Sequence, residues 1–141
     1  MIRLLFIAAL FLSTQVSFAQ TWERNLEKAF ADSKSQRKEI LLVFTVRDHC
    51  ETCDLLEQRV FQSEYFKQEV ASRYILFKYD FETDKHSISE QELAARLRMV
   101  EKYNKDGFFP YLVLVAPDGR ILKSRGSYDG ESAASFLKFL K

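Results

Sequence analysis

The sequence has few of the residues from which metal sites and disulfide-stapled domains are built. Its 141 residues include only two cysteines and two histidines. Two cysteines are too few to staple a small secreted fold. A zinc site would need two ligands besides the cysteines, and only His49 and His86 are available, which makes zinc a minor alternative. The cysteine count instead fits a single functional pair.

The sequence also lacks an excess of charge of either sign. Lys and Arg number 21 and Asp and Glu number 20, for a net charge of +1. This balance gives no reason to expect a nucleic acid or an acidic surface as a partner. The chain also shows no internal repeat, low-complexity tract or interdomain linker, so we expect one folded domain.

The apolar N-terminus is too short to anchor the chain in a membrane. Its apolar stretch, 4–12, is nine residues long, far below the roughly 20 residues that a spanning helix needs. Arg3 precedes this stretch, and Ser17-Phe18-Ala19 supplies the small residues that a signal peptidase recognises. We therefore predict a cleaved signal peptide at residues 1–19 and an exported, soluble domain without stable membrane insertion at residues 20–141.

The most informative stretch is residues 40–61. It starts with the apolar run Ile40–Val46, which is typical of a strand at the centre of a sheet covered on both faces. Cys50-Glu51-Thr52-Cys53 follows, and Leu56 and Val60 then recur at helical spacing. The two cysteines are therefore predicted to lie where a buried strand leads into a helix.

This position suits disulfide exchange. The thiolate is the attacking species, and unpaired N–H groups at a helix N-terminus stabilise a negative charge there. Cys50 would attack, and Cys53, one turn further along, would resolve the mixed disulfide. A purely structural disulfide across so short a loop would gain little stability from loop closure. A c-type haem site would need His after the second cysteine, where the chain has Asp54.

Apolar spacing and capping residues predict the remaining helices. Ser63 can cap a short helix that runs to Val70, and Ser89 with Glu92 forms the S-x-x-E pattern of a capping box. A first helix is expected from Thr21 onward. The apolar positions of the first helix, the Ser89 helix and a final helix are, in chain order, Trp22, Leu26, Ala29 and Phe30; Leu93, Leu97 and Val100; and Ala133, Phe136, Leu137 and Leu140.

Two further regions read as strands. Residues 74–81 alternate between two faces, and a polar link with a solvated His86 follows at 83–87. The turn Pro117-Asp118-Gly119-Arg120 predicts a hairpin between residues 111–116 and 121–124. Strands separated by helices pair in parallel, while a closing hairpin is antiparallel. We therefore predict an α/β fold, a mixed sheet of about four strands with helices on both faces.

Three motifs together resemble the thioredoxin fold. They are the strand ahead of Cys50-Glu51-Thr52-Cys53, Phe109-Pro110 at the start of a strand, and the hairpin at Ala116–Arg120. More closely, the segments Cys50–Phe61 and Ser63–Val70 resemble exported thioredoxin-like domains related to the C-terminal domain of the Dsb-type periplasmic reductases. The resemblance covers nearly all of the predicted mature chain. It rests on the combination, because Cys-x-x-Cys alone is a weak signal.

The resemblance implies a thiol-disulfide oxidoreductase that works without a cofactor or metal through a Cys50–Cys53 disulfide. Pro110 would follow a cis peptide bond and stand beside the cysteine pair, and the backbone of Phe109 would pair with the substrate chain. The implied partners are protein disulfide substrates and an upstream protein that donates or accepts thiol electrons. We expect a monomer located in the periplasm, or otherwise secreted.

The chain departs from thioredoxin at two places. The Trp-Cys-Gly-Pro-Cys sequence of thioredoxin is replaced by His49-Cys50-Glu51-Thr52-Cys53, which lacks the flanking aromatic residue and the rigid dipeptide. Phe44 replaces the buried acid that thioredoxins carry six residues before the first cysteine. A general acid or base for Cys53 is therefore not obvious. Lys78 and Asp80 share a predicted strand face and either lie beneath the pair or form a solvated, ion-paired face.

Charges near the pair oppose one another. Glu51 and Asp54 disfavour a thiolate at Cys50, whereas the helix terminus, Arg47 and His49 favour it. Thr52 completes the group expected to modulate the pair. A less stabilised thiolate makes the disulfide a weaker oxidant, which favours a reducing or exchange role over strong oxidation.

Two other functions stay open at this point. A thioredoxin-like scaffold with a fixed structural disulfide could be a non-catalytic binding module that docks a partner through its aromatic surface. The aromatic share of 14% permits this, and Phe108 and Phe109 beside Pro110 would suit either role. Delivery of copper or another metal by the two thiols would need a third soft ligand.

Overall fold

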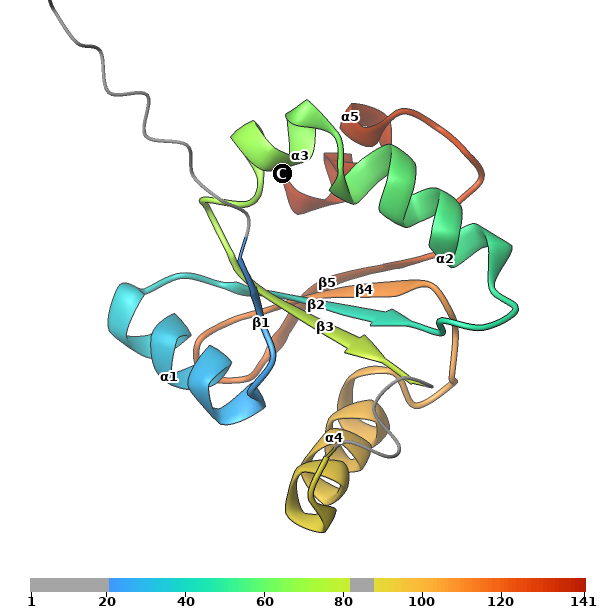
Figure 1. The fold of residues 1–141 in the computed structure, drawn as a ribbon. Coiled ribbons are helices and arrows are strands. Elements are labelled where there is room, and N and C mark those ends of the chain that lie inside the picture. The colour runs from blue at the N-terminus through green and yellow to red at the C-terminus, as the bar shows by residue number, and fades with distance from the viewer. Residues whose placement is uncertain (1–20, 82–87) are drawn as a thin grey trace, which may run out of the picture.

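The computed structural model describes residues 21–81 and 88–141. A five-stranded sheet in the order β1-β3-β2-β4-β5 forms its centre, with helices on both faces (Figure 1). The strands are β1 (Trp22–Glu23), β2 (Ile40–Thr45), β3 (Ile75–Asp80), β4 (Tyr111–Val115) and β5 (Ile121–Gly126). The helices are α1 (Leu26–Gln36), α2 (Glu51–Leu56), the π-helix η1 (Glu57–Phe61), α3 (Glu64–Glu69), α4 (Glu90–Tyr103), α5 (Ala133–Phe136) and the 3-10 helix η2 (Leu137–Leu140).

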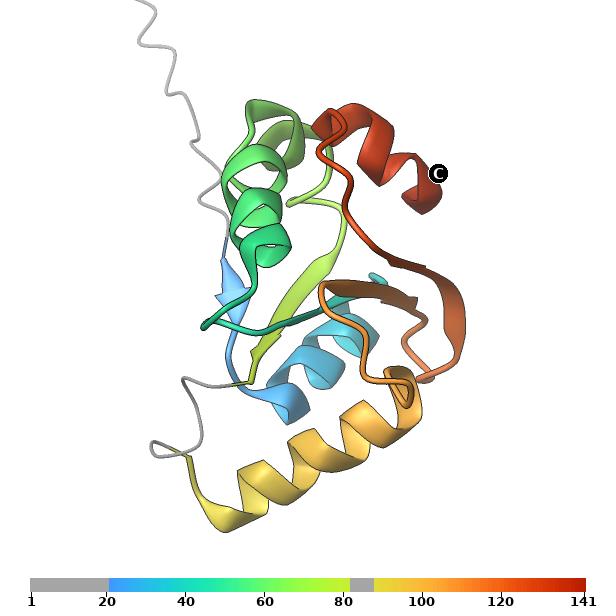
Figure 2. The ribbon, with the colours of Figure 1, turned by 90° about the vertical axis from the view of Figure 1, so that its right-hand side faces the viewer.

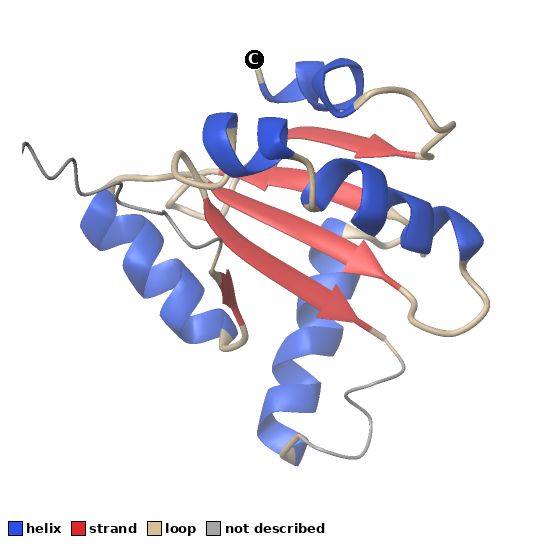
Figure 3. Ribbon diagram, turned by 45° about the horizontal axis from the view of Figure 1, so that its top comes forward, coloured by secondary structure: helices blue, strands red, loops and turns tan. Residues whose placement is uncertain are grey.

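Strand β2 is the centre of this sheet. It pairs in parallel with β3 and antiparallel with β4, and all six of its residues are buried. Leu41 and Val43 pack into a core with α2, η1, α3 and α5, while Leu42 and Phe44 face a second core with α1 and α4. Figures 2 and 3 show these two groups of helices on opposite sides of the sheet. The predicted α/β fold, with a mixed sheet covered on both faces, is confirmed.

The first segment differs from the prediction. A helix was expected from Thr21 onward, but Trp22 and Glu23 form β1, which pairs in parallel with β3. This short edge strand makes the sheet five strands wide instead of about four. Trp22 still serves as a core anchor, because its ring lies 5.3 Å from that of Phe61 and 6.0 Å from that of Phe66.

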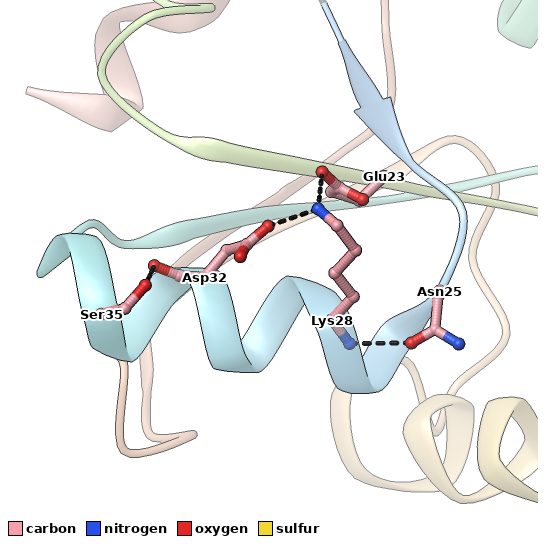
Figure 4. Close-up of polar contacts among 5 residues, drawn as sticks. All are labelled: Glu23, Asn25, Lys28, Asp32 and Ser35. Carbon is pink, nitrogen blue, oxygen red and sulfur yellow. Dashed lines mark hydrogen bonds and ion pairs between the residues drawn. The ribbon is translucent and has the colours of Figure 1, made fainter.

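Helix α1 begins after Asn25 because that side chain caps it. The Asn25 side-chain oxygen accepts the backbone N–H of Lys28 at 2.7 Å (Figure 4). The Lys28 ammonium then binds the carboxylates of Asp32 at 2.6 Å and Glu23 at 2.7 Å. The hydrogen bonds that Lys28 donates to Asp32 and Glu23 raise its pKa above the usual value. Because the Asn25 cap fixes the start of α1 at Leu26, Trp22 lies outside the helix although its spacing fits the apolar stripe.

The buried face of α4 is also rotated from the prediction. Leu97 was expected to face the core but is 47% exposed, whereas Met99, Tyr103 and Arg96 are buried. Burial of Arg96 is tolerated because its Nε donates to Glu92 at 2.9 Å and its guanidinium also donates to a backbone carbonyl, that of Arg24. A search for apolar residues alone does not identify this buried face of α4, because one of its residues, Arg96, is charged.

The helix after the cysteines changes its winding. At Glu57, α2 gives way to the π-helix η1, a wider turn that the sequence does not signal. Leu56 and Val60 are fully buried, as their spacing predicts, and Leu55 is half-buried. Short π-helical segments frequently occur at functional sites. Here the segment begins at Glu57, which lies next to the cysteine pair.

Several other predictions are confirmed. Ser63 and Ser89 cap α3 and α4 by accepting backbone N–H groups at 3.1 and 3.2 Å. Strand β3 alternates between the two cores, β4 and β5 form the predicted hairpin, and the apolar positions of the final helical segment are buried. None of the described helices is long and apolar enough to cross a bilayer. The predicted signal peptide at 1–19 and the polar link with His86 lie outside the described residues.

Candidate active site

The cysteine pair lies where β2 leads into α2, as predicted. Cys50 and Cys53 form a disulfide with an S–S distance of 2.07 Å and Cα atoms 5.2 Å apart. Cys50 is the N-cap of α2, and its Sγ accepts the backbone N–H of Cys53 at 3.3 Å. Cys53 is only 4% exposed, whereas Cys50 is partly exposed. One cysteine is therefore reachable from solvent and the other is shielded.

The residues expected to modulate the pair all lie at the surface. His49, Glu51, Thr52 and Asp54 are exposed. His49 adopts the left-handed backbone conformation, with φ of 63°, in which histidine is found more often than most residues. Thr52 Oγ1 lies 3.7 Å from Cys50 Sγ. Because the acidic side chains are exposed, their charges act on the cysteines through water, where each interaction is weak.

On the β4 side of the pair, the chain forms an aromatic flank, which consists of Phe108, Phe109 and Tyr111 around Pro110. The predicted cis peptide bond between Phe109 and Pro110 is present. Tyr111 pairs with Phe44 near the end of β2, so Pro110 lies at the sheet edge from which the chain continues to Cys50. The Phe109 ring packs 5.0 Å from that of Phe81, while Phe108 is 59% exposed. The exposed ring is therefore Phe108.

Asn104 holds this flank in place. It is only 3% exposed, and its side chain binds the backbone of Phe108 at both polar groups. Asn104 Nδ2 donates to the Phe108 carbonyl at 2.9 Å, and Asn104 Oδ1 accepts the Phe108 N–H at 3.1 Å. In the sequence, Asn104 opens the segment Asn104-Lys105-Asp106-Gly107, whose residue types indicate only that a helix ends there. Its clamping role depends on a loop shape that spacing alone does not reveal.

On the β3 side, the cysteines meet a charged flank, which consists of Arg47, Glu57, Lys78 and Asp80. Lys78 Nζ lies 2.5 Å from Glu57 Oε2 and 4.4 Å from the centre of the Trp22 ring. Arg47 Nε donates to Asp80 Oδ2 at 3.2 Å. A pocket of about 320 Å³ joins this flank to the buried cysteine; it is lined by Thr45, Val46, Arg47, Cys53, Asp54, Glu57, Lys78 and Asp80.

From the sequence, Lys78 and Asp80 either lie beneath the cysteine pair or form an ion-paired face. The structure combines the two, because both side chains are ion-paired and both line the same pocket as Cys53. Phe44, by contrast, packs in the opposite core, with its ring 6.3 Å from that of Tyr79. Asp80 Oδ1 is buried and has no hydrogen-bond partner within the described part of the chain. The sequence does not single out Arg47 and Glu57 as partners of these residues, since their pairing depends on three separate elements.

Across residues 21–81 and 88–141, no group of three or more His, Cys, Asp or Glu side chains is arranged to hold a metal ion. The chemistry available at the site is instead that of a dithiol and a disulfide, flanked by an apolar surface on one side and by ionisable groups on the other.

Comparison with known proteins agrees with the geometry. The sequence model of the thioredoxin-like domain family matches residues 26–141. The disulfide bond reductase DsbH of Chlamydia pneumoniae is 31% identical over 117 residues, which cover 83% of this chain and 69% of DsbH. A solved structure of a DsbH oxidoreductase superposes with a TM-score of 0.75 at 27% identity, covering 92% of this chain and 88% of that one.

More distant structures share the fold. The oxidised C-terminal domain of DsbD from Neisseria meningitidis superposes with a TM-score of 0.56 at 19% identity, covering 82% of this chain and 90% of that domain. A thioredoxin from Thermus thermophilus gives the same TM-score and identity, covering 85% of this chain and 84% of its own. The chain therefore belongs to the thioredoxin-like domain family, in which its Cys50–Cys53 pair makes it a thiol:disulfide oxidoreductase.

Proposed function

We propose that this protein is an exported oxidoreductase that reduces or exchanges disulfides in other proteins, with Cys50 as the nucleophile and Cys53 as the resolving thiol. The observation that carries this assignment is the difference in burial between the two cysteines. A substrate disulfide can approach Cys50, whereas Cys53 is shielded from it. The Cys53 N–H at 3.3 Å from Cys50 Sγ further supports a thiolate at Cys50.

The reaction would start from the reduced protein. The Cys50 thiolate attacks one sulfur of a substrate disulfide, forming a mixed disulfide and releasing the other substrate sulfur as a thiolate that takes up a proton. The Cys53 thiolate then attacks Cys50 Sγ, which forms the Cys50–Cys53 bond and releases the second substrate thiol. The substrate gains two electrons and the protein loses two. An upstream dithiol protein would return the pair to its reduced form.

The direction of electron flow follows from the charges around Cys50. Glu51 and Asp54 carry negative charge near the sulfur, while Arg47 is engaged with Asp80. These side-chain charges add little to the stabilisation that the Cys53 N–H gives the thiolate, which leaves the dithiol form a good reductant. This balance favours reduction or exchange over strong oxidation.

The substrate chain is proposed to dock on the aromatic flank. In this arrangement the backbone of Phe109, next to Pro110, pairs with the backbone of the substrate chain. The exposed ring of Phe108 contacts apolar side chains of the substrate. Phe109 itself packs inward on Phe81, which keeps its backbone in a fixed position. Protein disulfides in extended segments are the expected substrates.

Trapping of the mixed disulfide tests the assignment of the two cysteines. Cys53→Ser should accumulate covalent adducts with substrate proteins, which disappear on addition of dithiothreitol and can be identified by non-reducing electrophoresis and mass spectrometry. Cys50→Ser is the matched control and should form no such adducts and show no turnover. Turnover by Cys50→Ser, together with an absence of adducts on Cys53→Ser, would overturn the assigned roles.

Export is proposed on the basis of residues 1–19. The mature protein should appear outside the cytoplasm with Gln20 as its first residue, because cleavage is expected after Ala19. Cell fractionation with N-terminal sequencing measures this directly. Ala19→Tyr is the control, because it replaces the small residue before the cleavage site. It should block cleavage without altering the folded domain.

A further inference from the structure

We propose that Asp80 accepts the proton that Cys53 must lose before it can resolve the mixed disulfide. This inference rests on the proposed function, in which Cys53 is the resolving thiol. Burial disfavours the charged form of a thiol, so a shielded cysteine needs a nearby group to take its proton. Strand β2 supplies no acid for this purpose, since Phe44 faces the opposite core and Val43 and Thr45 line the cysteine side.

Asp80 is the carboxylate in this pocket with an acceptor still available. Its Oδ2 accepts from Arg47, but its Oδ1 is buried and lacks a hydrogen-bond partner within the described residues. Buried polar atoms are nearly always paired, and an exception at a reactive site calls for a chemical explanation. A pocket of about 320 Å³ that also contacts Cys53 is large enough to hold water. Because Cys53 and Asp80 line the same pocket, water in that pocket would connect the thiol with the Asp80 carboxylate, and Oδ1 becomes an acceptor once a small movement opens it to this water.

The other carboxylates of the pocket are less suited to this step. Glu57 Oε2 is engaged by Lys78 at 2.5 Å, and the Glu57 side chain is 38% exposed. Asp54 lies on the exposed face of α2. The Asp80 side chain is 21% exposed and is held in place by Arg47 at 3.2 Å. Asp80 thus combines a fixed position with an acceptor atom that is not engaged by a described partner.

Among the described residues, the ionisable groups around Asp80 come from several elements. Arg47 follows β2, and Lys78 lies on β3 itself. Asp54 and Glu57 come from the cysteine helix. Glu23 and Arg24, from β1 and the turn after it, and Arg96, from α4, line a second pocket that also contacts Asp80. The described groups that line these two pockets with Asp80 are thus the cations Arg24, Arg47, Lys78 and Arg96 and the carboxylates Glu23, Asp54 and Glu57.

The proton balance of the step is simple. The Cys53 thiol gives its proton to the Asp80 carboxylate, and the resulting thiolate attacks Cys50 Sγ of the mixed disulfide. The bond between Cys50 and the substrate sulfur breaks, and the substrate leaves as a thiolate that is protonated by water. When the upstream dithiol later reduces the disulfide, Asp80 returns its proton to Cys53.

Single-turnover kinetics with an aromatic disulfide test this proposal. Reduced protein should release one coloured thiolate when Cys50 attacks and a second when Cys53 resolves the adduct, and Cys53→Ser should show only the first phase. In Asp80→Asn, the second phase should slow by about tenfold or more at neutral and acidic pH. It should then recover as the pH rises, because hydroxide replaces the missing acceptor. The first phase should stay within about twofold.

Glu57→Gln is the matched control, because it removes the same charge from the same pocket. Loss of a negative charge alone favours the Cys53 thiolate, so it should leave the second phase unchanged or faster. An unchanged or faster second phase in Asp80→Asn would overturn the proposal, as would a tenfold slower one in Glu57→Gln. Deuterium oxide offers a test without any variant: it should slow the second phase more than the first, and equal effects on the two phases would contradict the role of Asp80.

The outcomes also separate this inference from the function on which it rests. If the unmodified protein shows no second phase, the role of Cys53 as the resolving thiol is wrong. If the second phase is present and Asp80→Asn matches the unmodified protein across the pH range, only the role of Asp80 is wrong.

Discussion

The aromatic flank and the charged flank stand on opposite sides of β2, and they hold their residues by different means. The aromatic flank is fixed by backbone geometry: a cis peptide bond at Pro110, the clamp of Asn104 on the Phe108 backbone, and the start of β4. The charged flank is fixed by side chains that come from three elements and meet as two ion pairs. One flank carries an exposed aromatic ring, and the other lines a pocket together with the buried cysteine.

This difference separates two tasks of the site. The proposed docking of a protein substrate would use an exposed apolar surface, and Phe108, on the β4 side of the cysteine pair, is 59% exposed. Proton handling requires ionisable groups near Cys53 that solvent does not fully screen, and the pocket lined by Asp80 and Lys78 supplies them. Changes to the aromatic flank should therefore affect substrate affinity or stability, and the loss of Asp80 from the charged flank should affect pH dependence.

The largest effect is expected where the aromatic flank is clamped. Asn104→Ala removes two hydrogen bonds and leaves both polar groups of the Phe108 backbone without their partner, which should lower the free energy of unfolding by about 2–3 kcal/mol. Urea denaturation measures this value. The neighbouring exposed residue provides the control, since Lys105→Ala should change stability by less than about 0.5 kcal/mol. Equal stability of the two variants would show that the clamp contributes nothing.

The exposed ring of the aromatic flank should matter for binding but not for folding. Phe108→Ser should weaken the apparent affinity for a protein disulfide substrate by about fivefold to tenfold, while the rate with a small disulfide stays unchanged. Ile121→Ser is the matched control, because Ile121 is a similarly exposed apolar residue, at 46%, at the far end of the β4–β5 hairpin. Similar losses for both variants would argue against docking at Phe108.

The charged flank should show a moderate coupling between its members. Lys78 binds Glu57 and lies over the rings of Trp22 and Phe61 at 4.4 and 5.1 Å. A double-mutant cycle with Lys78→Met and Glu57→Gln should give a coupling free energy of about 1 kcal/mol in urea denaturation. A coupling indistinguishable from zero would mean that solvent screens the pair and that the flank is held by packing on Trp22.

The smallest effect is expected from the surface charges between the flanks. The double variant Glu51→Gln, Asp54→Asn removes two negative charges near Cys50. The pH profile of Cys50 alkylation should therefore move to lower pH, by roughly half a unit for exposed groups. Iodoacetamide kinetics measure this, with Glu64→Gln as a control for an exposed acid outside the site pocket. An unchanged profile would remove the charge argument for a reducing role.

The two flanks also differ in how far the sequence predicts them. Phe109-Pro110 and the cysteine pair are local motifs, so their positions and the strand-to-helix junction could be predicted directly. The spacing of Leu56 and Val60 likewise predicted the buried face of the cysteine helix. The pairing of Arg47 with Asp80 could not be predicted, because it depends on the parallel register of β2 and β3.

Other errors have equally local causes. Trp22 fits a helical stripe by spacing, but the Asn25 cap starts the helix later, and Trp22 pairs with β3 at the edge of the sheet. Leu97 fits an apolar stripe, but the core instead takes in Arg96, whose charge is bound by Glu92. Apolar periodicity identifies the elements of this fold well. It fails where a capping residue decides the start of a helix, and where an ion pair allows a charged residue to be buried.

The reduction potential of Cys50–Cys53 tests the central claim most directly. The folded protein is equilibrated across a dithiothreitol series, and its free thiols are counted by alkylation and gel shift. A reducing or exchange role predicts that the bond opens in the folded state with a potential near or below about −250 mV. A potential near about −120 mV would indicate an oxidase, and a bond that stays closed under strong reductant would indicate a structural disulfide in a binding module.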